Sequence, residues 1–574
     1  MRISASHLVG VILLLSFVAA LFGCVGGTKD AHVPEAGPVT EPPIAVKAKP
    51  DVAVEDEGKA EAVGPQVIES VEQEPVIEEV VKPPVVEPVE QTLQRPIIDA
   101  EGFDPEHIEY PDATFPIAYA VVVSEATFND PEWNAVLGAL CTRHDAELFV
   151  HEGADPRVAL KQLKHFSPHY VCVFAKPDEL GDIQRCVRTI QTVRAIDADP
   201  YQDAVWAILT AYDTTDAMRM INAESLVVSN ALLHAGLHWL KWFPTGVAFN
   251  EIRKGTYATK QLGEEPQQHT DGPQDTTGPF LEALHTNTAD IITTSGHASQ
   301  RDWTMGYRYQ SGHIVSGPEA TLAAIDLDGN RHPILSDNPK IYYSPGNCLI
   351  AHISHPDCMC LAWMHSGGVN QFFGHIKEQT RQCWAWGIAK YFLELQGRYN
   401  FAESVHLNTQ SGLDALINND AIEEHFKRSY ARCLHITLLY GDPAWDARVM
   451  KETTSTYEQE LAIEDLPDGK VKFTFRVTAN EEIVFDKKPN RNRPAMAVLP
   501  FRIVPDTAQA ECPDGGRVTV VDDLLMFYPV QAVGETLAKD ESRYVTVIAE
   551  HAPLLDQMPT FTDESSVSDE ADTQ

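Results

Sequence analysis

From Pro116 onward, short apolar runs alternate with amphipathic stretches, and this alternation leaves few folds open to the chain. Runs rich in Val, Ile and Ala are typical of strands buried on both faces of a sheet, and the stretches between them have the periodicity of covering helices. The pattern therefore predicts an α/β fold. Strands are predicted at 117–123, 147–150, 170–174 and 204–209, and helices at 131–144, 156–166, 180–193 and from 214.

After about Trp445 the pattern changes to an alternation of single apolar and polar residues. Asp-Gly, Gly-Gly and Pro-containing turns separate the alternating runs, as they do between antiparallel strands. This part of the sequence predicts an antiparallel β-sandwich. Its strands are predicted at 471–477, 495–503, 517–521, 524–528 and 544–548.

The N-terminal segment has the features of an export signal. Arg2 is the only charge before the mostly apolar run Leu8–Phe22, which is shorter than the roughly 20 residues that a membrane-spanning helix needs. The run ends in Gly23-Cys24, which resembles the bacterial lipoprotein cleavage box, in which the Cys becomes the lipidated first residue. An ordinary signal peptide with an incidental Cys is the alternative. The resemblance implies a signal peptide at 1–23 and a lipid anchor at Cys24 that holds the exported chain on a membrane.

Two segments of biased composition flank the predicted folded parts. Residues 24–114 are rich in Pro, Val and Glu, so we expect an extended, disordered tether between the anchor and the folded chain. Residues 556–574 are acidic and are predicted to be disordered as well. In a cell with an outer membrane, Val25 at the second mature position favours sorting to that membrane, by resemblance to the lipoprotein rule.

Length and charge narrow the class of protein further. The 574 residues correspond to about four domains of usual size, so more than one folded unit is expected. The chain has 44 Lys and Arg against 83 Asp and Glu, a net charge of −39. So acidic a chain repels a phosphate backbone, and nucleic acid is not expected as a partner.

Two predicted strand ends carry residues that could perform nucleophilic catalysis. The apolar run 289–294 ends in Ser-Gly-His297, and the run 340–344 ends in Pro-Gly-Asn-Cys348. Ligand sites of such sheets lie at the carboxyl ends of strands, so this His and Cys are expected to face each other at one edge. A neutral imidazole can take the thiol proton, and peptide N–H groups in tight turns can bind the developing oxyanion.

The order of these features resembles the gingipain-like cysteine peptidases of the caspase-type fold. After the strand-Gly-His and strand-Cys features come Ala362-Trp363-Met364-His365-Ser366-Gly367-Gly368-Val369 and Phe373-Gly374. The acidic stretch 197–205 lies upstream, and Leu439-Tyr440-Gly441-Asp442-Pro443 resembles the end of the family's catalytic domain. The resemblance implies a caspase-like or gingipain-like αβα sandwich at 115–445, followed by an immunoglobulin-like β-sandwich at 446–555.

The resemblance also implies roles for individual residues. Cys348 would be the nucleophile, His297 the general base and Asp203 the acid that orients the His. The backbone N–H groups of Cys348 and Ala298 would form the oxyanion hole. The family usually has Gly where this chain has Ala298, whose Cβ is expected to narrow the cleft or change the allowed conformations of the turn. The implied activity is that of a membrane-anchored cysteine endopeptidase acting on proteins or peptides.

The resemblance leaves two further expectations open. No cofactor is required for this chemistry, but related peptidases often bind structural calcium, and Asp197 and Asp199 are the predicted ligands. A catalytically inactive relative, acting as a surface lipoprotein that binds peptides or envelope components, is the alternative function. Trp303, Tyr307 and Tyr309 follow the His turn, where they could line a substrate pocket or, as the alternative, pack as ordinary core aromatic residues.

Cysteine and histidine positions raise one rival kind of site. His352, His355, Cys358 and Cys360 could bind zinc, but the Cys-Met-Cys spacing is not that of a zinc knuckle. The chain has ten Cys, and lipidation of Cys24 leaves nine. At least one thiol is therefore expected to be unpaired.

Overall fold

The computed structural model describes residues 118–286, 288–379, 383–418, 422–484, 492–532 and 534–552. The predicted signal peptide, the lipidation site Cys24, the tether and the acidic tail lie outside these residues. Residues 115–117, the first of the predicted α/β part, lie outside them as well. Within the described ranges, no helix is both long enough and apolar enough to cross a bilayer.

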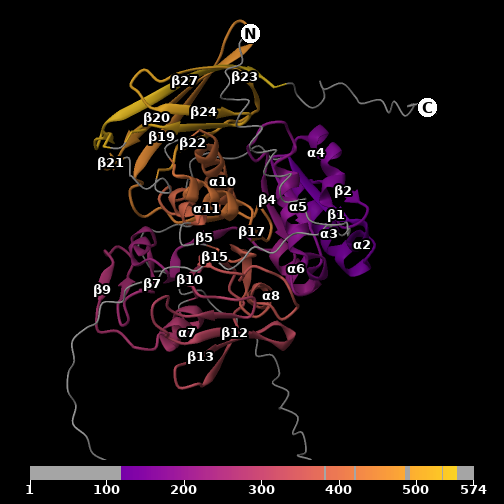
Figure 1. Ribbon diagram of the computed structural model, residues 1–574, viewed down its shortest axis with the longest axis vertical. Coiled ribbons are helices and arrows are strands. Elements are labelled where there is room, and N and C mark those ends of the chain that lie inside the picture. The colour runs from indigo at the N-terminus through magenta and orange to yellow at the C-terminus, as the bar shows by residue number, and fades with distance from the viewer. Residues whose placement is uncertain are drawn as a thin grey trace, which may run out of the picture. The chain divides into compact units, whose positions relative to one another are not determined.

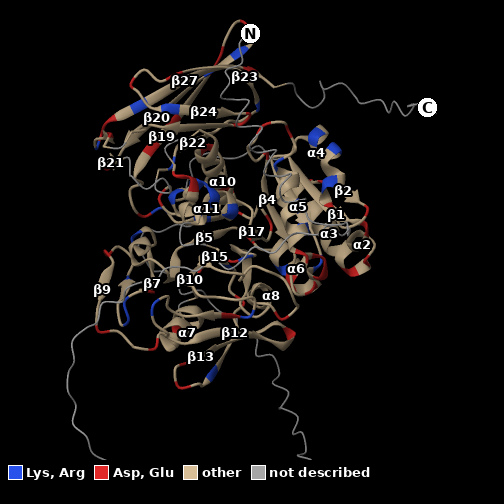
Figure 2. Cartoon of the chain, in the orientation of Figure 1, with Lys and Arg blue, Asp and Glu red and all other residues tan. Residues whose placement is uncertain are grey.

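A mixed sheet of twelve strands forms the centre of the α/β part (Figure 1). The central strands carry few charged residues (Figure 2), as expected for strands that are covered on both faces. In spatial order the strands are β2 (Glu147–His151), β1 (Tyr119–Ser124), β3 (Tyr170–Phe174), β4 (Val205–Leu209), β17 (Thr437–Tyr440), β16 (Val369–His375), β15 (Lys340–Asn347), β10 (Ile291–Gly296), β6 (Asn230–His234), β7 (Thr245–Phe249), β8 (Tyr257–Lys260) and β9 (Gln267–His269).

The strands of this sheet run in two directions. Strands β1 to β4 and β17 are parallel to one another, and β16, β15, β10, β6 and β7 are parallel to one another. The two sets meet where β16 pairs antiparallel with β17. The carboxyl ends of β10 and β15 therefore lie at the same sheet edge as the amino end of β4.

Helices cover both faces of the sheet, as the alternating sequence pattern predicts (Figure 1). The helix predicted at 131–144 is α3 (Pro131–His144), which begins where the Asp130 carboxylate accepts the N–H groups of Glu132 and Trp133. One face is covered by α3, α6 (Thr214–Ile221), α9 (Ile388–Phe392), α10 (Phe401–Asn418) and α11 (Glu424–Leu434). The other is covered by α4 (Leu160–Phe166), α5 (Ile183–Val193), α7 (Thr277–His285) and α8 (Met359–His365).

A smaller antiparallel sheet follows the His297 turn. Its strands are β11 (Asp302–Thr304), β12 (His313–Gly317), β13 (Thr321–Ile325) and β14 (Arg331–Ile334). Ile314, Leu322 and Ala324 turn their side chains into the core beneath α7 and α8. This sheet thus fixes the chain segment that leads away from the His turn.

After Trp445, β18 (Ala447–Val449) pairs parallel with β5 (Leu226–Val228), and the later strands form three antiparallel sheets (Figure 1). The smallest of the three consists of β21 (Ile483–Val484) and β26 (Thr536–Leu537). The Phe475 and Phe527 rings meet edge to face between the two larger sheets, with centroids 6.3 Å apart.

The strands predicted at 471–477, 517–521, 524–528 and 544–548 are confirmed, whereas the run predicted at 495–503 contains only the four-residue β22 (Ala495–Val498) and the first residue of β23 (Ile503–Glu511). β19 (Tyr457–Asp465) and the rest of β23 were not predicted, because most of their side chains are exposed or half-buried. The larger sheet has the spatial order β19, β20 (Lys470–Ala479), β27 (Ser542–His551) and β23. The sheet opposite it has the order β22, β25 (Leu524–Tyr528) and β24 (Arg517–Val521).

Hydrogen bonds join these sheets to the α/β part within one unit, Glu109–Gln574. The buried carboxylate of Asp414, on α10, accepts hydrogen bonds from Arg517, Thr519 and Tyr528. Burial alone would raise the pKa of Asp414, but the Arg517 guanidinium and hydrogen bonds from Thr519 and Asn418 hold it below its usual value. The C-terminal sheets are thus tied to α10 by a buried, charge-assisted network.

Candidate active site

The two predicted catalytic residues directly follow paired residues of neighbouring strands. In the parallel pair β10 and β15, Gly296 lies opposite Asn347, so His297 and Cys348 are the next residues on the two strands. The strands approach so closely here that a Cβ atom added to Gly346 would lie only 2.5 Å from the Cβ of Ser295. The fold brings an imidazole and a thiol to adjacent strand ends.

A buried amide holds these two strand ends together. The Nδ2 of Asn347 donates to the carbonyl oxygen of Gly296 at 3.1 Å. Its Oδ1 accepts from the hydroxyl groups of Thr294 and Ser344, each at 2.6 Å. Sequence reasoning missed the role of Asn347, although a polar residue at a strand end, directly before the candidate nucleophile, was a signal that could have pointed to it. The amide fixes the backbone on both sides of the site.

Cys348 lies half-buried on a tight turn. The next residue, Leu349, has φ of 59°, a left-handed conformation that is uncommon for a side chain of this kind and is often found at functional sites. The backbone N–H of Gln379 donates to the Cys348 Sγ at 3.4 Å. A peptide N–H aimed at the sulfur is the kind of contact that stabilises a thiolate.

The His297 side chain is exposed and is held by an aromatic neighbour. Its ring stacks on Tyr307, with the centroids 5.3 Å apart and an interplanar angle of 25°. Its carbonyl oxygen accepts from the N–H of Thr304, which pins the turn to β11. Trp303 packs in the core, one of its two expected roles: its ring is fully buried and its Nε1 donates to the Ser295 carbonyl. Tyr307 is the aromatic residue next to the site.

The predicted oxyanion donors lie in the two turns at the site. Ala298 follows His297 after β10, and Cys348 directly follows the last residue of β15. The left-handed position of the His turn is Gly296, with φ of 102°, and Ala298 has no positive φ. An Ala therefore fits this position without the backbone strain that a left-handed conformation would impose.

Asp203 lies at the same sheet edge as His297 but far along it. It precedes β4, and β17, β16 and β15 lie between β4 and β10. Four spacings of about 4.8 Å put roughly 19 Å between the two strands. The Asp203 carboxylate instead accepts the N–H groups of Ile196 and Asp197. Asp203 is thus not in a position to orient the His297 ring, and the structure does not bring the three predicted residues together.

Asp203 belongs to a group of carboxylates between the α/β part and the C-terminal sheets. Oxygen atoms of Asp197, Asp199 and Asp522 lie within 4.8 Å of one another. Burial, followed by the neighbouring charge of Asp197, raises the pKa of Asp199 to about 6 and raises the pKa of Asp203 as well. Arg502 is the nearby cation: its Nη1 lies 3.1 Å from Asp522 and its Nη2 donates to the Asp203 carbonyl. Sequence reasoning found Asp197 and Asp199 but not Asp522.

The rival zinc ligands do not converge in the described part of the chain. Cys358 and Cys360 are buried at the start of α8. The His352 Nε2 contacts the Gly181 carbonyl, whereas His355 pairs with Asp357. None of these four residues belongs to a described group of side chains that could hold a metal ion.

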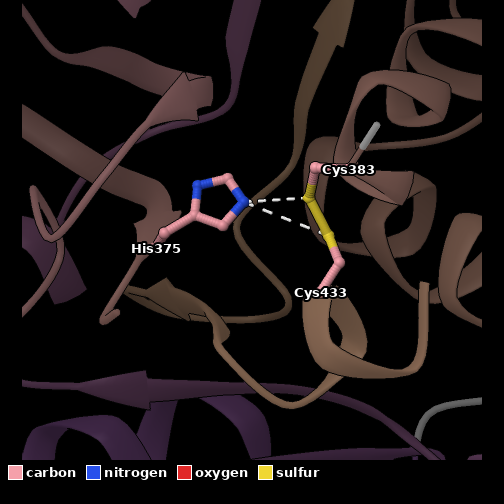
Figure 3. Close-up of side chains that lie close together, drawn as sticks. All are labelled: His375, Cys383 and Cys433. Atoms are coloured by element: carbon pink, nitrogen blue, oxygen red, sulfur yellow. Dashed lines mark hydrogen bonds between the residues drawn. A yellow bond between two sulfur atoms is a disulfide. The ribbon is translucent and has the colours of Figure 1, made fainter. Parts of the chain in front are cut away.

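A second cysteine and histidine cluster lies behind the candidate active site (Figure 3). Cys383 and Cys433 form a disulfide across 50 residues, and the Nε2 of His375 lies 3.0 Å from the Cys383 sulfur. The Nδ1 of the same ring contacts the Asn347 carbonyl at 3.1 Å. Burial lowers the pKa of His375 to about 4, so the ring is neutral. Sequence spacing gave no signal for this cluster, because its members are far apart in the chain.

No protein-family model matches the chain, and no curated protein matches it. The site offers an exposed imidazole, a half-buried thiol at the neighbouring strand end and the peptide N–H groups of the turns that carry them. These are the groups that nucleophilic acyl transfer needs: a base, a nucleophile and donors for the oxyanion.

Proposed function

We propose that the protein is a cysteine peptidase of the gingipain-like type, with Cys348 as nucleophile and His297 as general base. His297 takes the thiol proton, and the thiolate attacks the peptide carbonyl carbon to form a C–S bond. The peptide C–N bond then breaks, and the leaving amine receives the proton from His297. Water hydrolyses the thioester, which releases the acid product and restores the Cys348 thiol.

The pairing of Gly296 with Asn347 is the observation that carries this proposal. It supports a shared site because it fixes the backbone immediately before both reacting residues, and the Asn347 amide strengthens the link. The N–H groups of Cys348 and Ala298 are the proposed oxyanion donors. The sheet with helices on both faces also agrees with the caspase-like fold that the sequence resemblance implies. The His ring is held by Tyr307 rather than by a carboxylate from Asp203.

Cleavage of a diverse peptide library by the purified full-length chain tests the proposal. Cleavage is expected for the wild type, with a loss to background in Cys348→Ala and a loss of about 10²- to 10⁴-fold in His297→Ala. Cys141→Ala is the matched control, since Cys141 is another half-buried free thiol, and it should cleave as the wild type does. Cleavage that persists in Cys348→Ala overturns the proposal. No cleavage by folded wild type also overturns it, in favour of a peptide-binding surface protein.

The proposal includes export and a lipid anchor at Cys24. The disulfide between Cys383 and Cys433 supports export, because such bonds persist mainly outside the cytoplasm. The folded part would then act outside the cytoplasm, on the outer membrane in a cell that has one. Growth with radiolabelled fatty acid should label the wild type and the control Cys512→Ser but not Cys24→Ser. Equal labelling of Cys24→Ser would contradict the anchor and leave the peptidase proposal standing.

A further inference from the structure

Three metal-ligating side chains from separate chain segments meet in the buried cluster behind the candidate active site (Figure 3). His375 ends β16, Cys383 begins the segment before α9, and Cys433 lies on α11. Their exposed fractions are 0, 1 and 3%. One donor atom from each lies within 4.8 Å of the others. Imidazole nitrogen with two sulfur atoms is a donor set that zinc prefers.

In the oxidised cluster, the lone pair of the His375 Nε2 faces no hydrogen-bond donor. A carbonyl oxygen can only accept, so the Nδ1 of His375 carries the proton in its contact with the Asn347 carbonyl. The neutral ring then points the lone pair of Nε2 at the sulfurs of Cys383 and Cys433, at 3.0 and 4.0 Å. Disulfide sulfurs have no proton to donate, and among the described residues Nε2 contacts nothing else. A buried acceptor of this kind is unfavourable unless a donor or a metal ion faces it.

We propose that reduction of the Cys383–Cys433 disulfide creates a Zn²⁺ site with His375, Cys383 and Cys433 as ligands. A dithiol reductant supplies two electrons and two protons to the disulfide and is itself oxidised to a disulfide. Zn²⁺ then displaces the two thiol protons, which leave to solvent, and binds two thiolates and the Nε2 lone pair. Three protein ligands leave one coordination position for water or another small donor.

The geometry and the charge of the cluster suit this ion. Ordinary zinc bond lengths in a tetrahedron put imidazole nitrogen and thiolate sulfur about 3.5 Å apart, and the two observed separations lie on either side of that value. The Nδ1 proton of His375 is donated to a backbone carbonyl, the usual arrangement behind a zinc-bound histidine. Two thiolates cancel the charge of Zn²⁺, so the buried site is neutral overall.

The site is connected to the backbone around Cys348 but does not depend on the peptidase proposal. The His375 ring holds the carbonyl of Asn347, the residue before Cys348. Gln379, four residues after His375, donates its N–H to the Cys348 sulfur. Zinc binding would therefore stiffen the turn that carries Cys348, and failure of peptide cleavage would leave the zinc site untouched.

Cobalt(II) titration of the full-length chain tests the site, because Co²⁺ bound to thiolates absorbs strongly and replaces Zn²⁺ in such sites. The chain is reduced with a dithiol, freed of reductant without oxygen and shown by circular dichroism to be folded. We expect about one Co²⁺ per chain, a thiolate charge-transfer band, release of about two protons per ion and loss of the band when Zn²⁺ is added. The oxidised chain, which has the same sequence, should show no band.

Variants identify the ligands. Cys433→Ser and His375→Ala should each weaken Co²⁺ binding at least tenfold, whereas Cys360→Ser, which removes a buried thiol elsewhere, should not. If a variant does not fold, the comparison of oxidised with reduced wild type still shows whether the reduced cysteines bind Co²⁺. Absence of the band in folded, reduced wild type overturns the proposal, and so does a band that survives in Cys433→Ser but is lost in Cys360→Ser.

Discussion

In the described part of the chain, His297 and Cys348 follow adjacent strand ends and the His375 ring contacts a disulfide, and these two sites differ mainly in access to solvent. At the first, His297 is exposed and Cys348 half-buried, at the ends of two parallel strands. At the second, His375, Cys383 and Cys433 are almost wholly buried. The first is open to solvent, whereas the second admits only a proton, an electron pair or a small ion. The same functional groups thus have different chemistry because burial decides what can reach them.

The two sites share one backbone connection. The carbonyl of Asn347 binds the His375 ring, while the amide side chain of the same residue binds the Gly296 carbonyl beside His297. Asn347 therefore links the buried cluster to both proposed catalytic residues. Each prediction below tests how separate the two sites are.

Thiol alkylation should show the largest difference. In the folded chain we expect Cys348 to react with iodoacetamide at least about a thousandfold faster than Cys358 and Cys360, because those thiols are fully buried and react only after local opening. Burial also raises the pKa of Cys360. Mass spectrometry of peptides after timed alkylation measures the rates. In denaturant the three should react alike, and similar rates in the folded chain would contradict the assignment.

Loss of the disulfide should be the next largest effect. The double variant Cys383→Ser with Cys433→Ser opens a 50-residue loop, which is expected to lower the free energy of unfolding by about 4 kcal/mol. Urea denaturation measures the change. Reduction should destabilise the wild type by a similar amount and leave the double variant unaffected, and added Zn²⁺ should restore stability to the reduced wild type alone. A loss below about 1 kcal/mol would show that the cluster contributes little to the fold.

Removal of the linking amide should have a smaller effect on stability. Asn347→Ala leaves the Gly296 carbonyl and two hydroxyl groups without their partner, at an expected loss of about 2 to 3 kcal/mol. Ser344→Ala removes one of these hydrogen bonds and should lose about 1 kcal/mol. Thermal unfolding measures the stability of both variants, and peptide cleavage measures their activity. Full cleavage by folded Asn347→Ala would show that the strand ends are held by other contacts.

The predicted calcium site should have the smallest effect on stability, and this effect should depend on pH. The folded-state pKa of Asp199 is about 6, above its ordinary value of 3.8, so the stability due to its protonated form is lost as the pH rises through that interval. Relative to Asp199→Asn, the wild type should lose about 1 to 3 kcal/mol between pH 4 and 6 with a chelator present. Calcium should raise the melting temperature at pH 8 but not at pH 4.

Asp522→Asn separates calcium binding from simple ionisation. Calcium should no longer raise its melting temperature at pH 8, because one of three clustered carboxylates is then neutral. Asp465→Asn, a change at an exposed carboxylate of the C-terminal sheets, is the matched control. An equal calcium response in Asp522→Asn and Asp465→Asn would exclude the cluster as the site.

Much of the secondary structure could be predicted because local patterns determine it. The helix at 131–144 has both its cap and its first-turn Pro in the sequence, and the runs at 170–174 and 524–528 are buried strands with the predicted bounds. β19 was missed because its side chains face solvent too often to give an apolar run. The role of Trp303 stayed open until its burial was seen, because an aromatic residue near a site has no local feature that separates core packing from substrate contact.

The sequence by itself determined the strand ends that carry His297 and Cys348, because a buried apolar run followed by a small-residue turn is a local signal. It also determined the helices, the antiparallel C-terminal strands and the strong net negative charge. Only the tertiary structure decided the pairing of Gly296 with Asn347 and the distance between Asp203 and His297. The same holds for the place of Asp522 in the carboxylate cluster and for the contact of His375 with Cys383 and Cys433. These depend on strand order and on contacts between residues far apart in the chain, and neither leaves a periodic mark in the sequence.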